Sequence, residues 1–366
     1  MFIHPNQLVE KCLIVSDVFS QTNYPIVEKD TIVSTTHIKV LNSFLIDRVE
    51  VSPKLVNGQP FTPTKVLTDD RKLIKKEKIQ KKVLPFIEHY QTVVDGYQKM
   101  FKQWQSGQTL DIQQVRQLVV PLFKRVDEYQ AEIFLLGKRT TTDRYIYHHS
   151  VAVSLLAIIL AKRLGFEKES TQIGLAALIS DGGMSKINQR ILNHPGKLSE
   201  SDFTEIKKHT TYSYRLVEKN AALRKPVKLA ILQHHERVDG KGYPLRLAKE
   251  KINPYAKMIS IVDAYHAMTS YRVYQSKQSF YQAIVNMQKE VDKQFDACYL
   301  KVFITCLEDA LLEEKVYLSD GQTGTIVALR FTSYPEIIIQ IHDSHEILSL
   351  LEQENLKIKS LIQEIK

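Results

Sequence analysis

Apolar residues form long stretches with helical periodicity through the middle of the chain. Val151 to Leu164 is apolar almost all round, which is typical of a helix buried at the centre of a domain, and Ser170 to Ile179 repeats the pattern. The later helical stretches are Ser199–Lys219, Val227–His235, Pro254–Thr269, Ser279–Lys289 and Ala297–Glu314. Successive helices without intervening strands predict an all-α domain over residues 143–314.

Shorter apolar runs predict smaller units at both ends of the chain. In residues 1–62, β-branched runs such as Thr31–Val33 alternate with turn signals around a helical stretch, which predicts a small α+β domain. In residues 315–366, three short strands predict a β-hairpin annex or a small separate domain, and the charged segment from His345 predicts a closing helix. The predicted fold class is therefore mainly α, with small β-containing units at the ends.

Residues 69–135 predict a helical pair that serves as a connector or a dimerisation arm. Its opening, Arg71–Lys82, is strongly basic, and such a helix can bind anionic lipid or nucleic acid. We expect the more common case, a solvated helix face.

Composition and charge narrow the class of protein. The chain has 43% apolar and 25% charged residues, as in globular proteins, and its net charge of +9 favours anionic partners without selecting nucleotide, nucleic acid or lipid. Cys12, Cys298 and Cys306 lack the spacing of a disulfide framework or a thiolate zinc site, so we expect a reducing cytoplasm. The longest apolar run, Val151–Ala161, is too short to cross a bilayer, and we expect no membrane span.

The densest candidate chemistry lies between His234 and Pro244. The adjacent His234 and His235 offer imidazole ligands suited to Zn, Fe, Mn or Ni, and they follow an apolar helical stretch that would hold them rigidly. Asp239-Gly240-Lys241-Gly242 then forms a polar loop that ends at Pro244. For the histidine pair alone, a surface turn with two solvated rings is the alternative interpretation.

The whole segment reads HHE-x-x-DG-x-GYP and resembles the signature of the HD-GYP family, metal-dependent phosphodiesterases of cyclic di-GMP. The resemblance extends from about Tyr145 to Lys289. It implies an HD-type helical domain with one or two divalent ions, Fe or Mn in preference to Zn, which generate hydroxide and neutralise phosphoryl charge. The positions that match the family's metal ligands are His149, Asp181, His209, His234, His235 and Asp263, with Asp181 as the bridging catalytic aspartate. The resemblance also implies nucleotide contacts from Gly242, Tyr243, Pro244 and Arg272, although a surface ion pair is the alternative for Arg272.

Several positions depart from the family pattern. Ser180 replaces the histidine of the HD dipeptide, and Met184 replaces the lysine that would hold the scissile phosphate. Tyr145 stands where the three-metal subgroup carries an acid, and Gln275 replaces a frequent basic residue. His266 replaces a second aspartate, so it is either a compensating ligand, directly or through a water, or a hydrogen-bond partner of a ligand.

These departures predict a degenerate HD-GYP protein of cyclic dinucleotide signalling, which binds metal and nucleotide with weak or no hydrolysis. An active metal-dependent cyclic di-GMP phosphodiesterase and a ligand-free interaction scaffold are the alternatives. The expected partners are cyclic di-GMP or a related dinucleotide, diguanylate cyclase-type proteins and a second copy of the chain.

Overall fold

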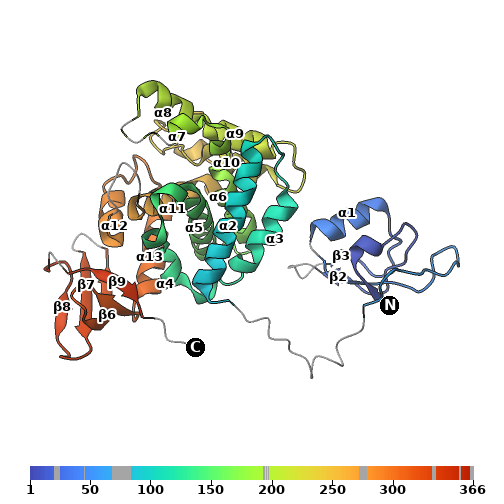
Figure 1. Cartoon of the computed structure of the whole chain (residues 1–366), viewed down its shortest axis with the longest axis horizontal. Helices are drawn as coiled ribbons and strands as arrows, with labels where there is room; N and C mark the ends of the chain where they lie inside the picture. The colour runs from blue at the N-terminus through green and yellow to red at the C-terminus, as the bar shows by residue number, and fades with distance from the viewer. Residues whose placement is uncertain are drawn as a thin grey trace. The chain divides into compact units, whose positions relative to one another are not determined.

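The chain forms two compact units, Met1–Val83 and Leu84–Lys366 (Figure 1). The computed structural model describes residues 1–19, 25–44, 46–67, 84–192, 194, 196, 198–271, 278–331, 335–353 and 356–362. The predicted basic helix Arg71–Lys82, Arg272 and Gln275 lie outside these residues.

The first unit is a small α+β fold with its own apolar core. Strand β1 (Phe2–Ile3) pairs antiparallel with β4 (Val49–Glu50), and β2 (Val18–Phe19) pairs with β3 (Pro25–Val27). The short helix η1 (Pro5–Gln7) follows β1. Helix α1 (Thr35–Ser43) begins at Ser34, whose hydroxyl accepts a hydrogen bond from the His37 amide and caps the helix.

The second unit is built around α5 (Tyr145–Arg163), in which every residue from His148 to Ala161 is buried. This helix packs against α6 (Ser170–Ser180) and α11 (Pro254–Thr269), as its all-round apolar sequence predicts. Among the described residues, Thr142–Arg163 is the one helical segment long and apolar enough to cross a membrane, but 83% of its apolar window is buried inside the fold. It has the character of a core helix.

Helices α2 (Phe86–Gln105) and α3 (Ile112–Phe123) share the core of α5 and α6. The buried face of α2 includes Tyr90, Val94, Tyr97, Phe101 and Trp104, at the spacing of one helix face. The described part of the helical pair predicted at residues 69–135 belongs to the second unit, and its role as a connector or a dimerisation arm stays a prediction.

The remaining helices surround this core and lead into the candidate site. They are η2 (Val126–Glu128), α4 (Gln130–Phe134), η3 (Leu136–Arg139), η4 (Thr142–Arg144), η5 (Gly182–Lys186), α7 (Gln189–Leu192), α8 (Glu200–Lys207), α9 (His209–Val217), α10 (Lys225–Gln233), η6 (Lys249–Lys251), α12 (Phe280–Gln288) and α13 (Ala297–Leu311). The predicted helix Ser199–Lys219 is therefore two helices, with Ser199 capping the first and a break at Lys208.

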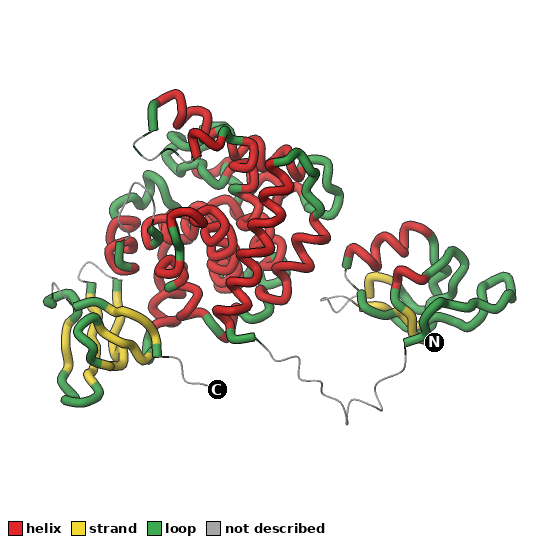
Figure 2. The backbone as a smooth tube through the Cα atoms, in the orientation of Figure 1, coloured by secondary structure: helices red, strands yellow, loops and turns green. Residues whose placement is uncertain are grey.

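A five-stranded antiparallel sheet lies at the C-terminal end of the second unit (Figure 2). Its strands are β5 (Lys315–Leu318), β6 (Thr323–Arg330), β7 (Glu336–Ile341), β8 (Ile347–Ser349) and β9 (Ile358–Leu361), in the order β8-β7-β6-β5-β9. Its apolar face packs on α13 and joins the main core. The predicted closing helix from His345 is wrong, because β8 and β9 pair with β7 and β5 and so satisfy their backbone groups within the sheet.

Candidate metal centre

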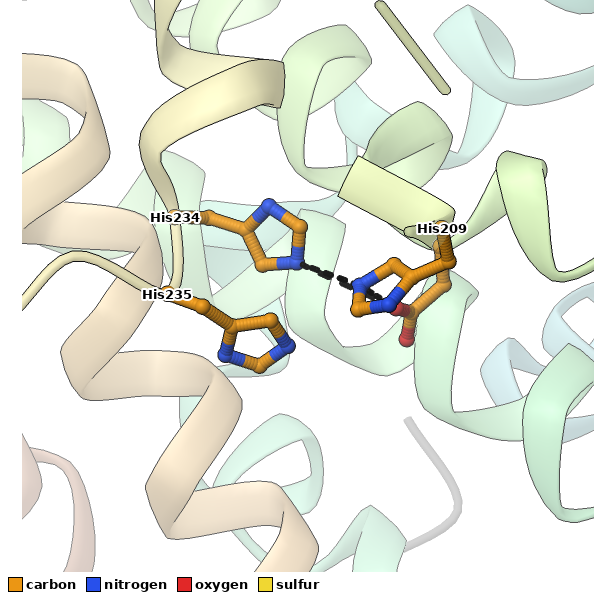
Figure 3. A group of neighbouring side chains, drawn as sticks. His209, His234 and His235 are labelled. Carbon is orange, nitrogen blue, oxygen red and sulfur yellow. Dashed lines mark hydrogen bonds and ion pairs between the residues drawn. The ribbon is translucent and has the colours of Figure 1, made fainter. Parts of the chain in front are cut away.

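The six predicted ligands come from five helices of the helical domain or from their ends, and they meet at one place. His149 lies in α5 and Asp263 in α11, whereas the others stand at helix ends. Asp181 directly follows α6, His209 is the first residue of α9, and His234 and His235 directly follow α10. Figure 3 shows the rings of His209, His234 and His235 turned toward one another. Positions at helix ends bring these side chains together, because successive residues can point in the same direction once the backbone leaves the helix.

The donor atoms form two groups that share Asp181. The first group is Asp181, His209, His234 and His235, and the second is His149, Asp181 and Asp263, with the donors of each group within 4.8 Å of one another. Asp181 Oδ1 lies 3.3 Å from His209 Nε2 and 3.9 Å from His234 Nε2. Asp181 Oδ2 lies 3.5 Å from His149 Nε2, and Asp263 Oδ1 lies 2.8 Å from the same nitrogen. One carboxylate thus faces both groups, as a bridging ligand would.

The tautomers of His209 and His234 place two nitrogen lone pairs beside a carboxylate, an arrangement that a cation would stabilise. The Nδ1–H groups of His209 and His234 donate to the carbonyls of Ile206 at 2.7 Å and Ile231 at 2.8 Å, which leaves a lone pair on each Nε2. Burial lowers the pKa of both rings to about 4, so they are neutral at pH 7. The two Nε2 atoms nevertheless lie 3.3 Å apart and both face Asp181. Lone pairs and a carboxylate that converge in this way repel one another unless a cation lies among them.

The spacing of the donors also fits a metal ion. Bonds of about 2.1 Å place neighbouring ligand atoms roughly 3.0 Å apart in an octahedral shell and roughly 3.4 Å apart in a tetrahedral one. Most of the separations just given lie close to these values. His235 completes the first group. Burial, and to a smaller extent the electrostatic field of His234, holds the pKa of His235 well below its ordinary value. Although burial raises the pKa of Asp263, its hydrogen bond with His149 and the nearby imidazoles lower it well below the ordinary range. Neutral imidazoles and ionised carboxylates are the protonation states that bind metals.

His266 lies behind His149 and outside the two donor groups. Its Nδ1 is 3.0 Å from His149 Nδ1, on the side of the ring away from Asp181 and Asp263. Tyr145 OH is 3.2 Å from the same His149 nitrogen, and its ring stacks on that of His149. Ser270 Oγ is 3.2 Å from His266 Nδ1. This position suits a residue that orients His149 rather than one that binds a cation directly.

His148 faces away from the two donor groups. Its Nδ1 lies 3.1 Å from Tyr90 OH on α2, whereas the adjacent His149 faces the carboxylates. Burial and the charge of Arg144 lower the pKa of His148 to about 4. It is a neutral residue of the core.

Ser180 and Met184, which depart from the HD motif of the family, make contacts within the helical core. Ser180 Oγ donates to the Ala176 carbonyl of its own helix at 2.8 Å, and Met184 packs against the main apolar core. Lys186, two positions beyond Met184, donates to the Trp104 carbonyl at the end of α2. These contacts hold Ser180 and Lys186 away from the donor groups.

Gly183 is required where η5 passes under α9. A Cβ atom at this position would lie 2.1 Å from the His209 carbonyl oxygen and 2.4 Å from the Ser213 amide nitrogen. Ser213 Oγ accepts from the Gly183 amide at 2.7 Å and donates to the Ser180 carbonyl at 2.5 Å. These contacts fix His209 relative to Asp181, and the sequence motif gave no indication of the part played by Ser213.

The loop after the histidine pair is fixed by a buried carboxylate. Glu236 accepts hydrogen bonds from the amides of Leu245 at 2.7 Å and Leu247 at 2.9 Å, which draws the end of the loop back to its start. Gly242 packs so closely that a Cβ atom would lie 2.3 Å from the Arg237 amide nitrogen. The Tyr243 ring then lies 4.7 Å from that of His235, centroid to centroid. The motif contained Glu236, but its role is visible only in the folded chain.

Comparison with known families agrees with this architecture. Residues 131–298 match the family described as HD domain. The predicted relationship to the HD-GYP phosphodiesterases is confirmed by relatives that are named cyclic di-GMP phosphodiesterases.

One relative is a cyclic di-GMP phosphodiesterase of Pseudomonas aeruginosa, 32% identical over 229 residues, which cover 62% of this chain and 55% of that protein. The cyclic di-GMP phosphodiesterase PdeB of Borreliella burgdorferi is 29% identical over 184 residues, 50% of this chain and 48% of that protein. The chain thus spans about half the length of these curated relatives. The structure also aligns with that of an HDG"Y"P protein from Bdellovibrio bacteriovorus, with a TM-score of 0.46 and 16% identity over 83% of this chain and 97% of that one.

Proposed function

We propose that this protein binds a divalent cation at the Asp181 cluster and a cyclic dinucleotide beside it, in cyclic di-GMP signalling, with weak or no hydrolysis. The observation that supports it most is the convergence of two neutral imidazole nitrogens on one carboxylate. Asp181, His209, His234 and His235 would hold one cation, and His149, Asp181 and Asp263 would contribute to a second, weaker position. Iron or manganese is the expected metal, and when bound it would polarise a phosphodiester and activate water.

The residues at this site favour binding of the cyclic dinucleotide over its hydrolysis. Ser180 leaves the His149 group without the imidazole that the HD dipeptide would add, and Met184 brings no charge to a phosphate. Loss of one electrostatic contact to the transition state commonly costs about 2.7–4 kcal/mol, or 100- to 1,000-fold in rate. We therefore expect slow hydrolysis of cyclic di-GMP, because a loss of this size lowers the rate without requiring it to be zero. The association with a second copy and with diguanylate cyclase-type proteins stays a prediction.

The test compares binding with turnover in the same preparation. The protein is loaded anaerobically with Fe(II) or Mn(II), its affinity for cyclic di-GMP is measured by calorimetry, and the linear product is followed by chromatography. We expect binding with turnover far below that of a relative with an intact HD dipeptide. Turnover equal to that relative would favour the active enzyme, and an absence of both metal and nucleotide binding would favour an interaction scaffold.

A further inference from the structure

A basic cleft adjoins the metal centre on the far side of Tyr243. It has a volume of about 620 Å³ and lies between the end of α8, the start of α9 and the loop after the histidine pair. Four of its lining side chains are cationic, namely Lys207, Lys208, Lys241 and Arg246, and none is acidic. The cleft therefore favours an anion of the size of a small ligand.

Two of the four cations are partly neutralised and two are available. Lys208 Nζ lies 2.6 Å from Glu205, and Lys241 Nζ lies 3.6 Å from Asp239. Within the described ranges, Lys207 and Arg246 form no ion pair with a carboxylate. They are therefore the cations that an incoming phosphate would meet.

The cleft shares a wall with the metal centre. Tyr243 lines the cleft, and its ring lies 4.7 Å from that of His235 and 6.2 Å from that of His209, centroid to centroid. Lys207 Nζ lies 5.8 Å from the Tyr243 ring centroid, and Lys207 precedes His209 by two residues. An anion in the cleft is thus held beside the residues that would hold the cation.

Aromatic surface lies next to the charge. Phe203 on α8 is 49% exposed, and Lys207 Nζ lies 4.7 Å from its ring centroid. A nucleotide offers phosphate groups for the cations and bases that stack on exposed aromatic rings. This combination favours a nucleotide over a small inorganic anion.

We propose that this cleft binds a phosphate group of the cyclic dinucleotide through Lys207 and Arg246. This inference rests on the proposed function, and Lys207 and Arg246 are the residues through which the protein would recognise the nucleotide. The phosphate would then be contacted from α8 and from the loop after Pro244.

The experiment measures the affinity of the manganese-loaded chain for cyclic di-GMP by calorimetry. The variants are Lys207→Gln, Arg246→Asn and the double variant. Asparagine is chosen because the backbone of Arg246 is left-handed, with φ of 55°, and asparagine tolerates that region. Lys301→Gln, on an exposed position of α13, is the matched control for loss of one positive charge.

We expect each single substitution to raise the Kd about five- to tenfold, as for a charge-assisted hydrogen bond at a partly exposed site, with manganese content unchanged. The double variant should show a larger loss, and Lys301→Gln should match the unaltered chain. Phosphate buffer, compared with chloride of equal ionic strength, should weaken nucleotide binding to the unaltered chain more than to the double variant.

Three results would overturn the proposal. A Kd of the double variant within twofold of the unaltered chain would show that these residues do not contact the nucleotide. Thermal stabilisation by inorganic phosphate without competition against the nucleotide would assign the cleft to a separate anion. No nucleotide binding by the unaltered, metal-loaded chain would refute the proposed function itself, and this inference with it.

Discussion

Gly183→Ala should displace the start of α9 and weaken cation binding, because the new methyl group has no room. Its Cβ would lie 2.1 Å from the His209 carbonyl oxygen, whereas ordinary contacts begin at about 3.4 Å. The backbone must therefore separate by roughly 1 Å, several times the tolerance of about 0.2 Å on a metal–ligand distance. The two nearest obstructing atoms are backbone atoms, so a side-chain rotation cannot relieve these contacts.

The neighbouring Gly182 provides a matched control. A Cβ atom there would meet Leu216 Cδ1 at 3.4 Å and Trp104 Cζ3 at 3.5 Å, which is ordinary van der Waals contact. Gly182→Ala should therefore keep its affinity for manganese, whereas Gly183→Ala should lose about 10- to 100-fold, as when a residue that positions a metal ligand is altered. Overpacking should also lower the stability of Gly183→Ala by about 1–3 kcal/mol.

Competition with a fluorescent chelator measures the manganese affinity, and urea denaturation of the metal-free proteins measures the stability. The reasoning is refuted if Gly183→Ala binds manganese as tightly as Gly182→Ala. Equal losses in both variants would also contradict it, because a methyl group has room at position 182 and none at position 183.

Further predictions concern His266, the departures from the HD dipeptide, and pH. His266→Ala should weaken manganese binding without lowering the number of ions at saturation, since His266 contacts His149 and not the donor groups; a lost ion, measured by elemental analysis, would make it a direct ligand. Ser180→His combined with Met184→Lys should raise turnover of cyclic di-GMP by at least about 100-fold if charge at this position limits the rate, and unchanged turnover would place the defect elsewhere. The metal-free protein should lose stability as the pH falls from 6.5 toward 4, because unfolded His209 takes up a proton near pH 6.5 and the folded residue only near pH 4. Each such buried histidine contributes up to about 1.4 kcal/mol per pH unit in this window, and a urea midpoint that stays constant from pH 7 to pH 5 would show that the rings are not buried as neutral groups.

The sequence predicted the helical core and the positions of the candidate metal ligands, for different reasons. The apolar character of Val151–Leu164 on all sides could only be satisfied at the centre of a domain, and α5 lies there. The candidate ligand positions followed from the resemblance to the HD-GYP family, and the structure brings those side chains together. Their binding of metal is a proposal that the geometry supports.

Other features could not be derived from local patterns. The segment from His345 is rich in Leu, Glu and Lys, which favour helices, yet β8 and β9 form because the edges of the sheet offer hydrogen-bond partners from distant residues. The buried role of Glu236 and the contact of Lys186 with Trp104 likewise depend on segments that meet only after folding. Tertiary contacts of this kind have no signature in a single sequence.

Counting the divalent ions bound per chain tests the central claim most directly. The unaltered protein and a His234→Ala, His235→Ala double variant are dialysed anaerobically against manganese, and the bound metal is measured by elemental analysis with circular dichroism as the check on folding. We predict one or two ions in the unaltered chain and loss of the ion held by Asp181, His209, His234 and His235 in the variant. The same number of ions in both folded proteins would place the metal elsewhere and contradict the assignment of this cluster.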